Sequence, residues 1–145
     1  MDEWKKQVLA APHLPTRRYY VPATDVSELP NRLAAACESS GLEYVITQEA
    51  AAQVYAPFLS KISRVACRMA PGASDAALSK LEARAVAEGA NLLVIETKSE
   101  GELLFKESHD SVWLANPIQV YLDLLWSGGR SQEAAEHLRR ERIGV

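Results

Sequence analysis

One short pattern in this sequence combines an acid and an amine at a spacing suited to metal-dependent hydrolysis. Glu96 and Lys98 stand two residues apart at the end of an apolar run, LLVIET at 92–97. Residues at i and i+2 of a strand project from the same face, so both groups would adjoin one metal ion and its water. Such a site needs a second acid on a neighbouring strand, and the run SRVACRMA at 63–70 contains none. A solvated strand end is therefore preferred, and a nuclease that uses Glu96 and Lys98 is the alternative.

The histidines and cysteines lack the spacing of a metal site or an activated nucleophile. His13, His109 and His137 are far apart in the sequence, and no HxxxH or CxxC pattern is present. Cys37 and Cys67 each have apolar neighbours, which predicts buried free thiols. The sequence also lacks a phosphate-binding glycine loop. We therefore expect a protein with no cofactor, no bound metal and no catalytic activity.

Positive charge is most concentrated near the C-terminus. Arg139, Arg140 and Arg142 lie within one turn near the C-terminus of the predicted last helix, on its outward side, and Arg130 precedes its start. The helix dipole favours cations at this end, so stability alone can account for them. Guanidinium groups also match phosphate geometry, so we take these four arginines as a candidate patch that faces nucleic acid or another phosphate. A second basic group, for which a solvated face is expected, consists of Lys61, Arg64 and Arg68.

A single acid, Asp123, interrupts the apolar stretch PIQVYLDLLW at 117–126. Because this stretch is apolar nearly all round, it predicts a buried helix. Asp123 then marks either the one polar stripe of that helix or a buried acid. In the second case Arg130 or Arg139 would pair with it and tie the last two helices together.

Apolar runs and turn residues predict alternating strands and helices around these groups. Strands are expected at 17–21, 42–46, 63–70 and 92–97, followed by a hairpin with arms at 102–107 and 111–115 around Ser108–Asp110. Helix starts are predicted at Asp25 or Ser27, Thr47, Ser74, Asn116 and Ser131, and helix stops at Gly41 and Gly89. The run at 92–97 is typical of a central strand buried on both faces. The expected fold class is α/β (mixed α+β), a mixed sheet flanked by helices with the two C-terminal helices packed on it.

Length and composition favour one globular domain. The chain has 145 residues, of which 48% are hydrophobic and 24% charged. Its net charge of −3 argues against a protein that coats nucleic acid or a membrane with its whole surface. No signal-peptide pattern or membrane-spanning apolar run is present, so we expect a cytoplasmic protein without a membrane partner. The expected domain is 17–145, preceded at 1–16 by a linker helix or remnant of an upstream domain.

Two stretches of the chain resemble a known family of bacterial proteins. Residues 113–143, WLANPIQVYLDLLWSGGRSQEAAEHLRRERI, are similar to the C-terminal part of AbiEi-type antitoxins, where an apolar helix, a Gly-Arg turn and a second helix follow one another. Residues 44–59, YVITQEAAAQVYAPFL, are similar to that family's strand and next helix, although Gln48-Glu49 stands in place of a Leu- or Gly-like pair. The runs RRYYVP and GANLLVIE also fit, so the resemblance extends over about residues 17–143.

The resemblance implies a regulatory domain rather than an enzyme. AbiEi-type antitoxins belong to type IV toxin–antitoxin systems of phage defence, and they oppose a nucleotidyltransferase-like toxin without a stable toxin complex. Family members normally carry a winged-helix domain for transcriptional regulation, for which the sixteen residues before Arg17 are too few. We therefore expect the non-DNA-binding C-terminal domain, with nucleic acid or a target of the toxin as its partner. The alternative with Glu96 and Lys98 resembles the PD-(D/E)xK nucleases.

Overall fold

The computed structural model describes residues 16–57, 62–70, 74–97, 103, 106–127 and 131–143, and it confirms the mixed α/β class. In chain order, the elements are β1 (Thr16–Tyr20), the 3-10 turn η1 (Val26–Glu28), α2 (Leu29–Ser40), β2 (Tyr44–Thr47), α3 (Gln48–Tyr55), β3 (Val65–Met69), α4 (Ser74–Lys80), β4 (Arg84–Ala85), β5 (Leu92–Glu96), β6 (Glu107–His109), β7 (Val112–Leu114), α5 (Pro117–Ser127), α6 (Ser131–Leu138) and the π-helical turn η3 (Arg139–Ile143). The described strands form one seven-stranded mixed sheet in the order β4-β1-β5-β3-β2-β7-β6.

The apolar run at 92–97 forms the central strand that its composition predicts. β5 pairs with β1 in antiparallel and with β3 in parallel orientation, and Leu92–Ile95 are all buried. β3 is buried along its whole length, so both strands lie in the interior of the sheet. Both faces of such strands are covered, so their sequences are apolar almost throughout and do not alternate between apolar and polar residues.

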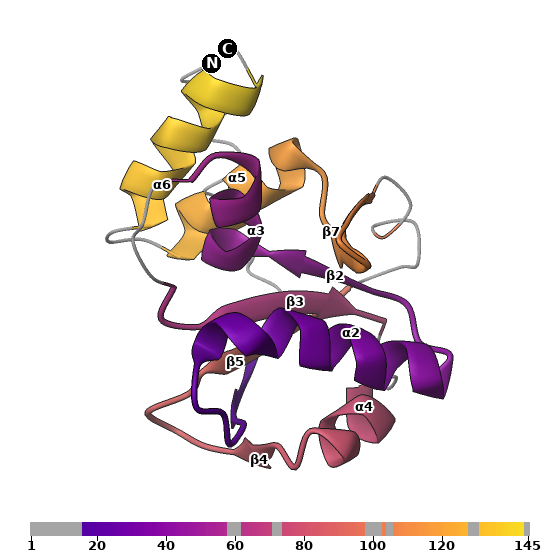
Figure 1. Cartoon of the computed structure of the whole chain (residues 1–145). Coiled ribbons are helices and arrows are strands. Elements are labelled where there is room, and N and C mark those ends of the chain that lie inside the picture. Colours follow the sequence, from indigo (N-terminus) through magenta and orange to yellow (C-terminus); the bar gives the residue numbers. More distant parts are fainter. Residues whose placement is uncertain are drawn as a thin grey trace.

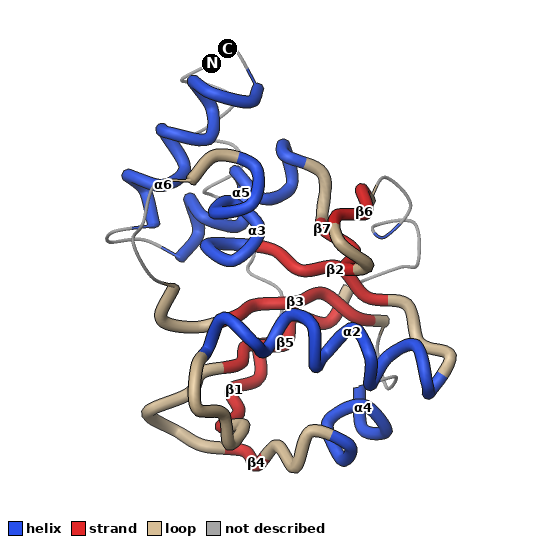
Figure 2. The backbone as a smooth tube through the Cα atoms, in the orientation of Figure 1, coloured by secondary structure: helices blue, strands red, loops and turns tan. Residues whose placement is uncertain are grey.

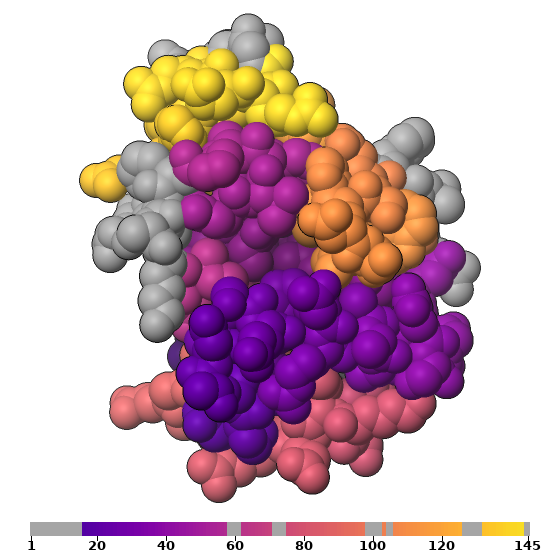
Figure 3. Space-filling model, viewed as in Figure 1, coloured from indigo at the N-terminus to yellow at the C-terminus, as the bar shows by residue number. Residues whose placement is uncertain are grey.

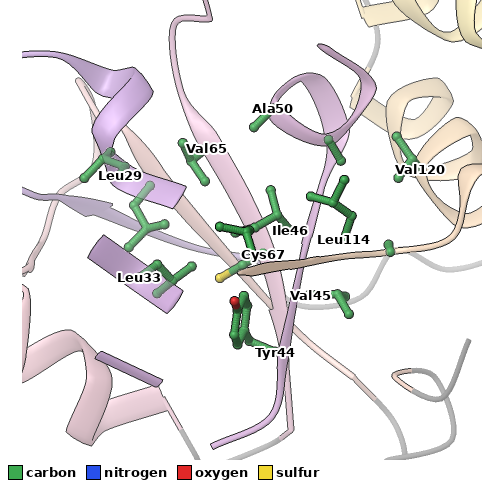
Figure 4. Packing of buried hydrophobic residues seen from close by; sticks show 14 of the residues in the cluster. Leu29, Leu33, Tyr44, Val45, Ile46, Ala50, Val65, Cys67, Leu114 and Val120 are labelled. Atoms are coloured by element: carbon green, nitrogen blue, oxygen red, sulfur yellow. The ribbon is translucent and has the colours of Figure 1, made fainter. Parts of the chain in front are cut away.

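The helices cover the sheet in two groups. α2 packs against α4 and crosses the middle of the sheet, whereas α3, α5 and α6 pack together beside the end that carries β2 and β7 (Figures 1 and 2). Figure 4 shows Leu29 and Leu33 of α2 beside Val65 and Cys67 of β3. Burial of these side chains is the main force that holds α2 on the sheet.

The C-terminal helices form as their end signals predict. Asn116 caps α5, because its Oδ1 accepts a hydrogen bond from the Gln119 N–H at 3.0 Å, and Pro117 takes the first position. α5 contacts β2 and packs against α3 and α6. The inward residues predicted for α6, which are Ala134, Ala135 and Leu138, are buried.

The helix that begins at Ser74 is much shorter than the sequence predicts. We expected it to reach Gly89, but α4 ends at Lys80, and Glu82 adopts the left-handed conformation with φ 56°. The Glu82 N–H donates to Ser79 O, and the Ala83 N–H donates to Leu78 O. These two hydrogen bonds are the pair that defines a Schellman turn. The chain after this turn is then free to pair with β1 as the exposed strand β4. The helix stop was missed because this turn uses glutamate where glycine is usual.

The predicted hairpin exists, but its turn lies later than expected. β6 and β7 are joined by Asp110 and Ser111, with φ values of 50° and 68°. Two consecutive left-handed residues make the tight turn whose twist matches that of paired strands. Ser108 therefore belongs to the strand β6 and not to the turn. Half of the predicted first arm, namely residues 102, 104 and 105, and the predicted helix at 2–10 lie outside the described residues.

None of the described helices has the length and apolar character that crossing a membrane requires.

Candidate functional site

The most deeply buried charges of the described chain are Arg68 in β3 and Asp123 in α5. Their side chains are 2% and 1% exposed. Arg68 Nε donates to Asp123 Oδ2 at 3.0 Å, and Arg68 Nη2 donates to Oδ1 at 2.6 Å. The two parallel bonds form the bidentate arrangement that makes arginine–carboxylate pairs strong and directional. The pair therefore fastens α5 to the centre of the sheet.

Two neutral groups also donate hydrogen bonds to the Asp123 carboxylate. Thr47 Oγ1 donates to Oδ2 at 2.5 Å, and Gln119 Nε2 donates to Oδ1 at 2.9 Å. Thr47 was predicted to cap α3, but its hydroxyl makes no cap hydrogen bond. The chain instead enters α3 directly from β2 through Gln48, whose φ is 56°. Gln48 lies where the resemblance leads one to expect a Leu- or Gly-like residue, and this conformation is uncommon for residues other than glycine.

The buried-acid interpretation of Asp123 is thus confirmed, while the partner comes from an unexpected element. Arg68 was expected on a solvated face and is buried, so that expectation was wrong. The partners proposed from sequence were Arg130, which lies outside the described residues, and Arg139. Arg139 Nε instead donates to Glu136 Oε2 at 2.9 Å, where α6 passes into η3. The sequence did contain a signal for this pair: one cation in an apolar strand and one acid in an apolar helix. Each charge would be costly to bury alone, so the two are expected to pair.

The C-terminal arginines have different surroundings and do not form one equivalent row. Arg139 is 27% exposed beside Glu136, at the i, i+3 spacing. Arg140 is exposed, and Arg142 is 45% exposed with Nη2 3.4 Å from Glu107 Oε1. The wide turn η3 redirects these side chains relative to a regular helix. Of the three described arginines, Arg140 is the one that is exposed without a carboxylate partner among the described residues.

Arg142 also joins a small cluster with the hairpin. Its guanidinium carbon lies 5.5 Å from the centre of the Tyr55 ring, and Tyr55 meets the His109 ring edge to face at 5.4 Å. Glu107 Oε1 lies 3.5 Å from His109 Nε2. Tyr55 donates its hydroxyl hydrogen to Ala115 O at 2.7 Å, and burial raises its pKa. This cluster holds η3 and the end of α3 against the β6–β7 hairpin.

The geometry around Glu96 shows an ion pair rather than an assembled metal site. Glu96 Oε1 lies 2.9 Å from Arg17 Nη2. Lys98, the second residue of the nuclease alternative, lies outside the described residues. A hydrogen bond with the Tyr19 side chain and then the charge of Glu96 raise the pKa of Arg17. Within the described ranges, no group of three or more His, Cys, Asp or Glu residues is placed to hold a metal ion. The described part of the structure therefore adds no support to the nuclease alternative.

Both cysteines are free thiols buried in the core, as predicted. Burial raises the pKa of Cys37 to about 11, and burial followed by the proximity of Cys37 raises that of Cys67. A raised pKa leaves little reactive thiolate at neutral pH.

Neither thiol is expected to react readily in the folded protein. At pH 8, alkylation of Cys37 by iodoacetamide should be about a hundredfold slower than in the urea-unfolded chain, because the thiolate fraction falls with the raised pKa. Mass spectrometry of timed samples measures this ratio. Equal rates in the folded and unfolded states would show that Cys37 is accessible and unperturbed.

The chain matches no protein-family model, no curated protein and no solved structure.

Proposed function

We propose that this chain is a regulatory, non-catalytic domain of the AbiEi antitoxin type. In this role it opposes a nucleotidyltransferase-like toxin of a type IV toxin–antitoxin system. The proposal begins from the resemblance of residues 113–143 and 44–59 to that family. It also includes the family's mode of action, in which no stable complex with the toxin forms.

One observation carries the proposal beyond sequence likeness: the two resembling stretches form a continuous body. β2 from the first stretch pairs with β7 from the second, with Ile46 opposite Leu114. α3 packs against both α5 and α6, and Thr47 donates a hydrogen bond to Asp123 across the same junction. Stretches that share one core must keep compatible shapes, so their joint resemblance supports a common architecture.

The surface proposed to act is the C-terminal end of this body. Arg139, Arg140 and Arg142 are borne on η3, which continues α6 at the C-terminal end of the described chain (Figure 1). In the space-filling view this C-terminal segment, shown in yellow, lies at the top of the visible face, next to α3 (Figure 3). An exposed guanidinium recognises phosphate through paired hydrogen bonds, so nucleic acid or a phosphate-bearing target of the toxin is the proposed partner.

Rescue of toxin-expressing cells tests the proposal. The full chain and a nucleotidyltransferase-like toxin of this type of system are placed under separate inducible promoters. We expect colony counts to recover when both are induced, and we expect no co-elution of the two proteins in size-exclusion chromatography. A chain that is folded and abundant but gives no rescue would reject the antitoxin role. A stable complex with the toxin would reject the proposed mode of action.

A further inference from the structure

A pocket of about 610 Å³ opens between the beginning of α2, the helix α3 and the β6–β7 hairpin. This volume falls within the range typical of small-molecule sites. The pocket is lined by the buried Ile46 and Leu114 and by Ala50 of α3. Val54, which is 50% exposed, forms part of its wall. In Figure 3 the three surrounding segments, indigo, purple and orange, meet near the middle of the visible face.

The carboxylates among the described lining residues are the main charged groups of the pocket. Asp25 lines it at the beginning of η1, and Asp110 lines it at the tip of the hairpin. No lysine or arginine occurs among the described residues that line the pocket. His109 forms another part of the wall, where Glu107 and Tyr55 hold its imidazole ring. An apolar floor with two carboxylates, and with no lysine or arginine in its described lining, attracts cations and repels anions.

We propose that this pocket binds a small organic ammonium ligand with an alkyl or aryl body. The apolar body rests against Ile46, Ala50 and Leu114, where it leaves water. The ammonium group points to the carboxylates of Asp25 and Asp110. None of the described C-terminal arginines lines this pocket, and the inference stands whether or not the chain acts as an antitoxin.

Both carboxylates can be neutralised without disturbing the backbone. Asp25 Oδ1 accepts from the Ser27 N–H at 3.0 Å, a cap hydrogen bond that asparagine makes equally well. Asp110 has φ 50°, a conformation that asparagine also tolerates. Asp25→Asn and Asp110→Asn therefore remove charge while the capping and turn roles remain. Asp75→Asn is the matched control, because Asp75 is exposed on α4 and does not line the pocket.

The experiment is an NMR titration of the full ¹⁵N-labelled chain with three ligands of nearly equal shape. These are 4-phenylbutylammonium, neutral 4-phenylbutanol and anionic 4-phenylbutanoate. We expect amide shifts at Ala50, Val54 and Val112 and a Kd that is roughly millimolar for the ammonium compound, given its few heavy atoms. The alcohol should bind about tenfold more weakly, and each Asp→Asn variant should lose about threefold in affinity for the ammonium. Asp75→Asn should bind as the unaltered protein does.

Each other result would overturn the inference. Equal affinity for the alcohol and the ammonium would show that the carboxylates do not select charge. Preferential binding of the carboxylate compound would reverse the proposed polarity. Amide shifts confined to residues away from the pocket would show that the ammonium compound does not bind here. The same conclusion would follow if no shift saturated below about 20 mM ligand.

Discussion

Replacement of Asp123 by alanine is expected to lower the free energy of unfolding by about 3–5 kcal/mol, because it leaves a buried guanidinium without its counter-charge. Arg68 is 2% exposed and cannot reach water without local unfolding. The same substitution removes the acceptor of the Thr47 and Gln119 hydrogen bonds. Urea unfolding followed by circular dichroism measures the loss.

Two variants separate this effect from the general cost of losing a carboxylate. Glu136→Ala breaks a partly exposed pair with Arg139 and should cost less than about 1 kcal/mol. The double variant Arg68→Met/Asp123→Leu should recover most of the stability, because well-packed apolar residues can replace a buried ion pair. A loss below about 1 kcal/mol for Asp123→Ala would mean that Arg68 regains solvent or another anion at little cost.

Charge reversal at Arg139 and Arg140 is expected to abolish rescue of toxin-expressing cells while the protein remains folded. Arg139 is partly exposed and Arg140 is exposed, so the double change to glutamate should cost only about 1 kcal/mol of stability. The melting temperature should therefore move by only a few degrees. A phosphate-bearing partner would meet two carboxylates in place of two guanidinium groups, and its binding should be lost. Colony counts and thermal melts of the same variant measure both quantities.

A matched charge reversal elsewhere provides the control. Arg18 and Arg84 are exposed on β1 and β4, at the opposite edge of the sheet from the β6–β7 hairpin. Arg18→Glu/Arg84→Glu changes the net charge by the same amount and should rescue fully. Rescue by Arg139→Glu/Arg140→Glu at normal expression would remove these two arginines from the mechanism. Loss of rescue in both double variants would indicate a dependence on overall charge instead.

Local sequence signals determined the elements whose ends and faces are set by near neighbours. The apolar run at 92–97 predicted a central strand, because only a doubly covered strand tolerates apolar side chains on both faces. Asn116 and Pro117 located the beginning of α5, because capping involves residues within one helical turn. Gly41 located the end of α2 for the same reason, with φ 68°. The inward face of α6 followed from the spacing of its small apolar residues.

Tertiary structure decided the features that depend on distant partners. The open edge of β1 accepts β4, so the chain after Lys80 becomes a strand where its own sequence suggested helix. The C-terminal arginines diverge because Glu136 and Glu107, which lie on different elements, engage Arg139 and Arg142. Arg68 and Asp123 are 55 residues apart, and each was ambiguous when considered alone. Only the packing of α5 on the sheet brings them together, and the cost of burying either charge alone makes that pairing obligatory.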